Sequence, residues 1–236
     1  MTTDSPAATL ARTARSLFFA AASAGSAVLL LVLLIVAGRV LGDEEYGRFA
    51  FALALATILE TLVDFGLKEL ATRSVARDHG VAPRLVRHTF GLKLLLGSGM
   101  FVLLVAVATV LRDEPEVRLA CYLLGAAAVL RSYLMTLRHT LNGLERFDLE
   151  SLVVVADRGF LLVFGVAALW AGGGLVGLTA AFVASRIAAL GLAYLVTRRQ
   201  VGPIGVGFDV TYWRDLQRAA LPFGLFVAVL SLYSYI

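Results

Sequence analysis

FAFALALATILETLVDFGLKEL, residues Phe49–Leu70, is a run of apolar side chains with few polar interruptions. A helix of about 20 apolar residues crosses the hydrocarbon core of a bilayer, which is about 30 Å thick. Lipid favours a helix because a helix satisfies its own backbone hydrogen bonds. The run therefore predicts a membrane span. It also holds two carboxylates, Glu60 and Asp64, which are one helical turn apart and so project from one face.

Further apolar runs of similar length predict five more spans. The first of them is longer than the hydrophobic part of a signal peptide, about 7–15 residues, so we expect it to be retained. A seventh run begins near Ala220 and continues to the last residue. The five additional spans are Ser16–Gly38, Arg87–Leu111, Arg118–Leu141, Ser151–Trp170 and Leu175–Val196.

The composition agrees with a membrane protein. Of the 236 residues, 59% are hydrophobic and 16% are charged, against about 45–50% and about 25% in soluble domains. We predict an all-α polytopic membrane protein in which a six-helix lobe precedes the start of a seventh helix. Because the chain ends inside an apolar run, we also expect it to be part of a longer protein. The predicted parts are a leader (1–15), the lobe (16–198), a linker (199–219) and the start of the seventh helix (220–236).

The basic residues in the connections and at the ends of the spans predict the orientation, because cytoplasmic connections are rich in Lys and Arg. Thirteen lie before the first span and in the second-to-third, fourth-to-fifth and sixth-to-seventh connections, and four lie in the others. We therefore place the N-terminus in the cytoplasm. The thirteen are Arg12, Arg15, Lys68, Arg73, Arg77, Arg84, Arg87, Arg138, Arg146, Arg198, Arg199, Arg214 and Arg218; the four are Arg39, Arg48, Arg112 and Arg118.

The linker contains an amphipathic segment, VTYWRDLQRAALPFG, residues 210–224. Helical spacing places Val210, Trp213, Leu216 and Ala220 on one side. We expect a short helix on the inner leaflet, with Tyr212 and Trp213 at the depth of the lipid headgroups. A plain turn between two spans is the alternative.

Seven ionisable residues lie more than one helical turn inside the predicted spans. A charge at the centre of a span costs about 2.5–3.5 kcal/mol on insertion scales, so such residues usually face the bundle interior and pair. With three acids and four bases, the interior is slightly cationic. That excess suits an anionic ligand such as a phosphate, since Arg binds phosphate oxygens through two parallel hydrogen bonds. The acids are Glu60, Asp64 and Asp157, and the bases are Lys93, Arg131, Arg158 and Arg186.

The two acids of the opening run lead to different expectations. Asp64 has Lys68 four residues later, so an ion pair at the cytoplasmic end of the span competes with a transport role. Glu60 has no base nearby in sequence. We expect Glu60 to be a proton-linked or cation-linked acid, and the alternative is a structural pair with a cation on another helix. Lys93 lies near the end of its span, and we expect its ammonium to reach the headgroups.

The other bases lie deeper in their spans. Arg131 and Arg186 are too far from either end to reach the headgroups easily. Asp157 and Arg158 are neighbours and point about 100° apart on a helix. We therefore expect those two side chains to form separate pairs with other helices.

The sequence has no motif for catalysis, cofactor binding or metal binding. Cys121 is the single cysteine and lies in an apolar run. His79, His88 and His139 stand apart without the spacing of metal ligands. We expect no enzymatic activity, no cofactor, no metal and no nucleic-acid partner.

Three segments resemble the polysaccharide-unit flippases, which belong to the multidrug/oligosaccharidyl-lipid/polysaccharide exporter superfamily. The first, at 38–78, contains LG-x-x-x-YG-x-F at 41–49 and a D-x-G turn at 64–66. The second is LNGLERFDLES at 141–151, and the third is ALPFGL at 220–225. The resemblance covers the whole chain but only the family's first lobe and the start of its second.

The resemblance implies a fold of two six-helix lobes around a central cavity, with alternating access produced by one lobe rocking against the other. It implies an undecaprenyl-pyrophosphate-linked oligosaccharide as substrate, surface polysaccharide biosynthesis as purpose and the bacterial cytoplasmic membrane as location. A polysaccharide polymerase and glycosyltransferases are further expected partners. By depth and charge, we take Arg131, Arg186, Arg158 and Lys93 as substrate-binding candidates, and Glu60, Asp64 and Asp157 as coupling or cavity acids.

Three alternatives stay open beside this interpretation. A multidrug or metabolite antiporter would share the fold, although a cationic-drug extruder favours an acidic interior. A membrane assembly subunit would transport nothing. A membrane-embedded glycosyltransferase is disfavoured, because the chain has no D-x-D pair and no large soluble loop.

Overall fold

The computed structural model describes the backbone of residues 6–233 and the side chains of residues 25–226. Within this range the chain is helical and has no strand. The side chains of the predicted leader, 1–15, and those of residues 227–236 lie outside the described part. The elements are α1 (Pro6–Asp64), α2 (Leu67–Arg77), the 3-10 turn η1 (His79–Val81), α3 (Ala82–Leu111), α4 (Pro115–Gly143), α5 (Phe147–Trp170), α6 (Gly174–Val201) and α7 (Val210–Tyr233).

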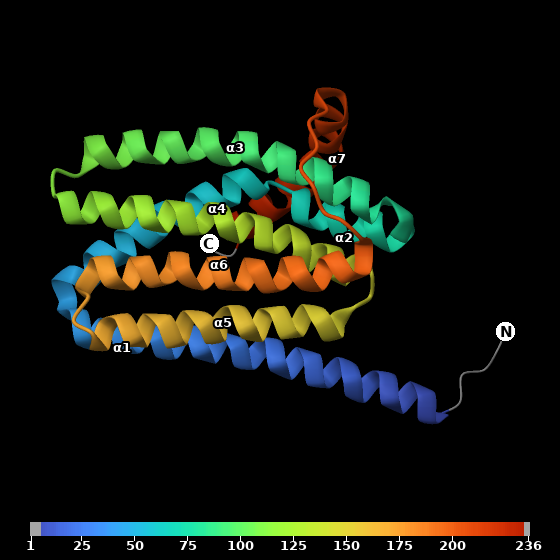
Figure 1. Cartoon of the computed structure of the whole chain (residues 1–236), viewed down its shortest axis with the longest axis horizontal. Helices are drawn as coiled ribbons and strands as arrows, with labels where there is room; N and C mark the ends of the chain where they lie inside the picture. Colours follow the sequence, from blue (N-terminus) through green and yellow to red (C-terminus); the bar gives the residue numbers. More distant parts are fainter. Residues whose placement is uncertain (1–5, 234–236) are drawn as a thin grey trace.

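Helix α1 contains two of the predicted spans. At 1.5 Å per residue, its 59 residues would be far longer than a bilayer is thick, but the helix is broken at Gly42 (φ 74°, ψ 176°). Only glycine adopts this backbone conformation without strain. The chain reverses there, so the two halves of α1 run in opposite directions (Figure 1). By length and composition, five described helices can cross a membrane, and the first of them, Gly25–Asp64, includes both halves.

The second predicted span ends earlier than expected. We expected it to reach Leu70, but α1 stops at Asp64 and α2 begins at Leu67. Gly66 lies between the helices with φ 73°, in the left-handed region. This conformation turns the chain, so α2 leaves α1 at an angle instead of continuing it.

Helix α4 is the centre of the bundle. It packs against α1, α2, α3, α5 and α6, and Figure 1 shows α3, α4, α5 and α6 lying alongside one another in alternating directions. Small side chains on α4, among them Ala120, Ala127 and Ala128, are buried in the largest core cluster. They allow the neighbouring helices to approach closely, as is common in membrane bundles.

The connections gather at two ends of the bundle (Figure 1). The links α2–α3, α4–α5 and α6–α7 lie at one end, and the break at Gly42 and the links α3–α4 and α5–α6 lie at the other. At the second end, Arg48 pairs with Glu114 at 2.9 Å, and Arg112 lies over the ring of Phe51. The connections that are rich in Lys and Arg therefore share one end, as alternating spans require.

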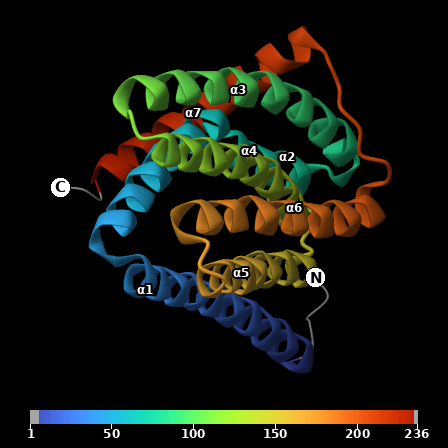
Figure 2. The same cartoon turned by 60° about the vertical axis from the view of Figure 1, so that its left-hand side comes forward.

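The linker between α6 and α7 returns along the bundle, and α7 crosses α2 and α3 (Figure 2). Trp213, Leu216 and Ala220 are buried against that part of the bundle, and the indole N–H of Trp213 donates to the carbonyl of His88 at 2.9 Å. Val210, which we expected on the same side, is exposed. The apolar side of this segment is thus covered by protein. The segment is not the separate short helix that we expect from the sequence, because α7 runs from Val210 through Pro222 to Tyr233.

Candidate functional site

The three predicted acids inside the spans each pair with a base on another helix. Asp64 of α1 pairs with Lys93 of α3, Glu60 of α1 with Arg131 of α4, and Asp157 of α5 with Arg186 of α6. These pairs connect five helices in the interior of the bundle. Such pairing is what low-polarity surroundings require of ionisable groups.

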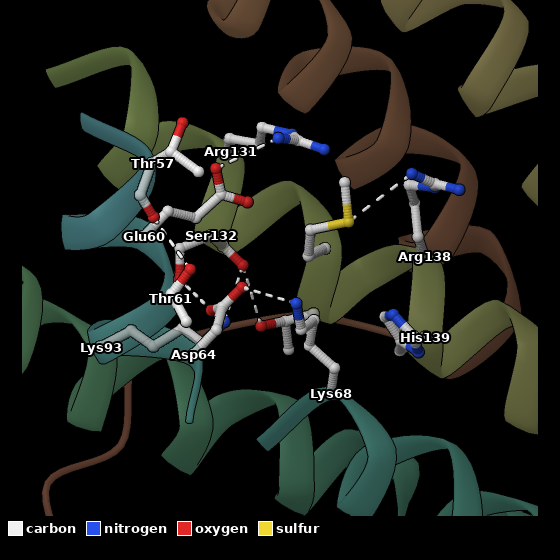
Figure 3. A network of polar contacts seen from close by, with 12 residues as sticks. Thr57, Glu60, Thr61, Asp64, Lys68, Lys93, Arg131, Ser132, Arg138 and His139 are labelled. Atoms are coloured by element: carbon white, nitrogen blue, oxygen red, sulfur yellow. Dashed lines mark hydrogen bonds and ion pairs between the residues drawn. The ribbon is translucent and has the colours of Figure 1, made fainter. Parts of the chain in front are cut away.

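Asp64 is the centre of a sealed network. Its Oδ1 accepts hydrogen bonds from Lys93 Nζ at 2.5 Å and from the Ser132 hydroxyl at 2.5 Å. Lys93 Nζ also donates to the Ser132 carbonyl oxygen at 2.7 Å. The side chains of Asp64 and Lys93 are each 1% exposed. Figure 3 shows these groups converging from three helices.

This network bears on two expectations, one for the Lys93 ammonium and one for the pair between Asp64 and Lys68. The prediction that the Lys93 ammonium reaches the headgroups is wrong, because the buried carboxylate of Asp64 and the Ser132 carbonyl hold the ammonium in the interior. The predicted pair between Asp64 and Lys68 is present, with a separation of 3.8 Å. This separation is longer than that between Asp64 and Lys93, and the Lys68 side chain is also more exposed than that of Lys93.

Glu60 and Arg131 form a more open pair, one helical turn away on α1. Arg131 Nη1 donates to Glu60 Oε2 at 3.2 Å, and the side chains are 30% and 12% exposed, respectively. Glu60 therefore has a cation partner on another helix, as the alternative for it requires, and its coupling role stays a prediction. The two side chains point toward each other in Figure 3.

A small cavity adjoins this pair. It has a volume of about 170 Å³ and lies between the two halves of α1, α4 and α6. Apolar side chains form most of its wall, and Glu60, Arg131 and Arg186 provide the charges. The structure thus brings three of the predicted residues to one cavity. Asp64 and Lys93 do not line it.

Arg158 differs from the other predicted bases. Among residues 25–226 it forms no ion pair, although it lies within electrostatic range of Arg131, Arg186 and Asp157. It is partly exposed. The predicted separate pairs for Asp157 and Arg158 are therefore found for Asp157 alone in that range.

The sequence analysis missed another ion pair next to these residues. Arg138 donates twice to Glu150 Oε1, at 2.5 and 3.0 Å. Arg138 had been counted as part of a connection, and Glu150 lies before the start of the predicted fifth span. A helix-to-helix distance is needed to detect this pair. We define the arginine seam as Arg131, Arg138, Arg158 and Arg186 together with Glu60, Glu150 and Asp157; its bases exceed its acids by one.

The described side chains also bear on metal binding. Within residues 25–226, no three His, Cys, Asp or Glu side chains gather closely enough to hold a metal ion. His139 instead contacts the Thr72 hydroxyl at 2.9 Å through Nδ1.

Three solved structures share the fold. An outward-facing multidrug resistance MATE family transporter of the MOP superfamily has a TM-score of 0.67 and 18% identity, and the match covers 89% of this chain and 51% of that one. A MATE structure in the straight conformation has a TM-score of 0.68 and 18% identity, with 92% and 52% covered. A MOP superfamily transporter from Pyrococcus furiosus Vc1, for which a binding pocket of reverse polarity suggests a different function, has a TM-score of 0.68 and 19% identity, with 91% and 52% covered.

The chain spans about half the length of these three structures and has the fold of that half. No curated protein matches the chain in sequence. The model of the polysaccharide biosynthesis protein family matches residues 13–236. This multi-pass membrane protein therefore belongs to the polysaccharide biosynthesis protein family.

Proposed function

We propose that the chain forms one lobe of a flippase that moves undecaprenyl-pyrophosphate-linked oligosaccharide units across the bacterial cytoplasmic membrane for surface polysaccharide biosynthesis. The N-terminus lies in the cytoplasm, and transport proceeds by alternating access. Family membership supports the link to polysaccharides. The shared fold with half of a MOP-superfamily transporter supports a two-lobe mechanism.

The excess positive charge of the arginine seam carries the proposal for an anionic substrate. Arg158 has no carboxylate partner among the described residues, and Arg131 and Arg186 line the adjacent cavity. A guanidinium offers phosphate two parallel hydrogen bonds. We assign contact with the diphosphate to Arg131, Arg158 and Arg186. Lys93 receives another role, because Asp64 and Ser132 enclose its ammonium.

The volume of the cavity beside Glu60 and Arg131 limits what that cavity binds. Pockets for small molecules typically measure about 300–1,000 Å³, whereas this cavity measures about 170 Å³. The lobe therefore contributes a site for the charged group of the substrate, while the sugars lie outside this cavity.

Glu60 is the acid that we propose for coupling to a proton or cation. It lines the cavity and holds Arg131 through a single hydrogen bond of 3.2 Å. A phosphate bound to Arg131 would compete with this carboxylate and release it. Asp64 is sealed against Lys93, so we assign it to holding the helices together. We assign Asp157 to positioning Arg186 beside the cavity.

The test is export of surface polymer after chromosomal replacement of single codons. Arg131→Ala and Arg158→Ala should each abolish or strongly reduce export while the protein remains at its normal level in the membrane. Arg39→Ala is the matched control, because Arg39 is exposed and lies outside the seam. Normal polymer in both seam variants would remove these residues from the substrate site.

The three MATE and MOP structures favour a second candidate, a drug or metabolite antiporter. The same strains distinguish the two. Loss of drug resistance with normal surface polymer would support the antiporter, and loss of polymer with normal resistance would support the flippase. A third outcome would indicate an assembly subunit. In that case, deletion of the chain would change neither drug resistance nor surface polymer, but other membrane proteins would no longer form a complex.

A further inference from the structure

The buried ammonium of Lys93 contacts one oxygen atom of α1 and one of α4, and two further oxygen atoms belong to the same two residues. Asp64 Oδ1 lies 2.5 Å from Lys93 Nζ, and the Ser132 carbonyl oxygen lies 2.7 Å from it. The Ser132 hydroxyl oxygen lies 2.5 Å from the same carboxylate oxygen. Asp64 Oδ2 is buried and has no hydrogen-bond partner. We call these four oxygens the Asp64–Ser132 oxygen site.

The chemistry of this set is that of a site for a hard cation. Carboxylate, carbonyl and hydroxyl oxygens are the ligands that such ions take in proteins. An ordinary ion pair needs only the carboxylate. Here the ammonium also bonds to a carbonyl in the middle of α4, which already accepts from the Thr136 hydroxyl at 3.3 Å. The Lys93 side chain extends from α3 to reach that place.

We propose that the Lys93 ammonium is a tethered cation, filling a site between α1 and α4 that binds an alkali metal ion when the ammonium is absent. The lobe thereby carries its own cation at this position. The inference rests on the fold and does not depend on the transported substrate.

The charge balance selects a monovalent ion. Lys68 lies 3.8 Å from the carboxylate and is partly exposed, so the Lys93 ammonium is the one buried positive charge that neutralises Asp64, and both of these side chains are 1% exposed. A sodium ion would restore that balance. A divalent ion would leave a net charge in a dry interior, where uncompensated charge is costly.

Lys68 is the competitor for the vacated place. Its ammonium lies 3.8 Å from Asp64 Oδ2, so it can close on the carboxylate once Lys93 is gone. The test variant therefore combines Lys68→Met with Lys93→Ala. The small alanine leaves room for an ion, and the methionine cannot supply an ammonium.

The experiment measures thermal unfolding of the purified chain in lipid nanodiscs. NaCl is titrated against choline chloride at constant ionic strength. The Tm of the test variant should rise steadily with the logarithm of sodium concentration, because an ion that binds only the folded state stabilises it by mass action. Lys68→Met alone should show no such rise, since Lys93 still fills the site.

A second control distinguishes the loss of the Lys93 charge from the opening of a cavity at that position. Lys68→Met combined with Lys93→Met removes the same charge but fills the volume with a side chain, so its Tm should not respond to sodium. Adding Asp64→Asn to the test variant should likewise abolish the response.

The inference is overturned if the test variant unfolds at the same Tm in both salts, or if Lys68→Met alone responds as strongly. Poor folding is also informative. Recovery of the test variant from membranes only in sodium supports the site, and failure to recover it in either salt overturns the proposal.

Discussion

Glu60 and Asp64 lie one helical turn apart on α1 and both reach α4, yet their surroundings differ. Glu60 meets Arg131 beside a cavity, with 12% and 30% of the two side chains exposed. Asp64 and Lys93 are each 1% exposed, and Ser132 closes the remaining side. Two acids at neighbouring positions of one helix thus form one ion pair that can exchange partners and one that is sealed from water.

The physical difference is desolvation. Breaking a buried ion pair leaves a charge with neither water nor partner, so removing one member costs much more than the pair itself contributes. A pair that retains contact with water loses little when it opens. The sealed pair therefore suits a role in holding helices, and the open pair suits one in which partners change.

The largest expected effect comes from breaking the sealed pair. Lys93→Met should lower the free energy of unfolding by about 3–5 kcal/mol, because Asp64 is left buried without its nearest cation. Reversible unfolding in detergent micelles measures this change. Lys68→Met is the control and should cost within about 1 kcal/mol, since its ammonium is partly exposed. Equal effects of the two variants would contradict the distinction between them.

A smaller loss of stability is expected when Ser132, the uncharged residue of the same network, is replaced. Ser132→Ala removes the hydroxyl that donates to Asp64, and loss of a hydrogen bond to a buried charged group costs about 1–3 kcal/mol. Thr61→Ala provides the comparison, because the Thr61 hydroxyl bonds only to the carbonyl of Thr57 on its own helix and is exposed. The Thr61 variant should change stability by within about 0.5 kcal/mol. A larger loss for Thr61 than for Ser132 would mean that the network is not the stabilising element.

The smallest effect on stability is expected at the open pair. Glu60→Gln should change the free energy of unfolding by about 1 kcal/mol or less, while it alters transport. We expect export by this variant to be impaired and to be insensitive to pH, whereas export by the protein with Glu60 should vary with pH. Surface polymer measured across a series of external pH values checks this. Unchanged export at every pH would assign Glu60 a purely structural role.

Much of the fold was predictable from the sequence, because lipid imposes a strong constraint on length and polarity. The apolar runs at Arg87–Leu111 and Ser151–Trp170 correspond to α3 and α5 with small shifts at their ends. The end of the second span was placed too late, since the apolar character continues past Gly66 and only the left-handed backbone there stops the helix. The reversal of the chain between the first two spans agrees with the predicted connection, and the structure places it at Gly42.

The sequence indicated most of the residues of the site, but it did not indicate which acid pairs with which base. Depth and charge singled out Glu60, Arg131 and Arg186, and all three line one cavity. The same reasoning misjudged Lys93, because its distance from the end of the span allows either the headgroups or the interior. The packing of α3 against α1 decides between them.

By itself, the sequence determined that this chain spans a membrane, how its connections alternate and which charges lie deep within the spans. These properties follow from transfer free energies, which depend on each segment alone. Only the tertiary structure decided that Lys93 pairs with Asp64, that Arg131 pairs with Glu60 and that Arg158 has no ion-pair partner within residues 25–226. Those outcomes depend on distances of a few ångströms between helices far apart in the chain, and electrostatic energies in a dry interior change steeply over such distances.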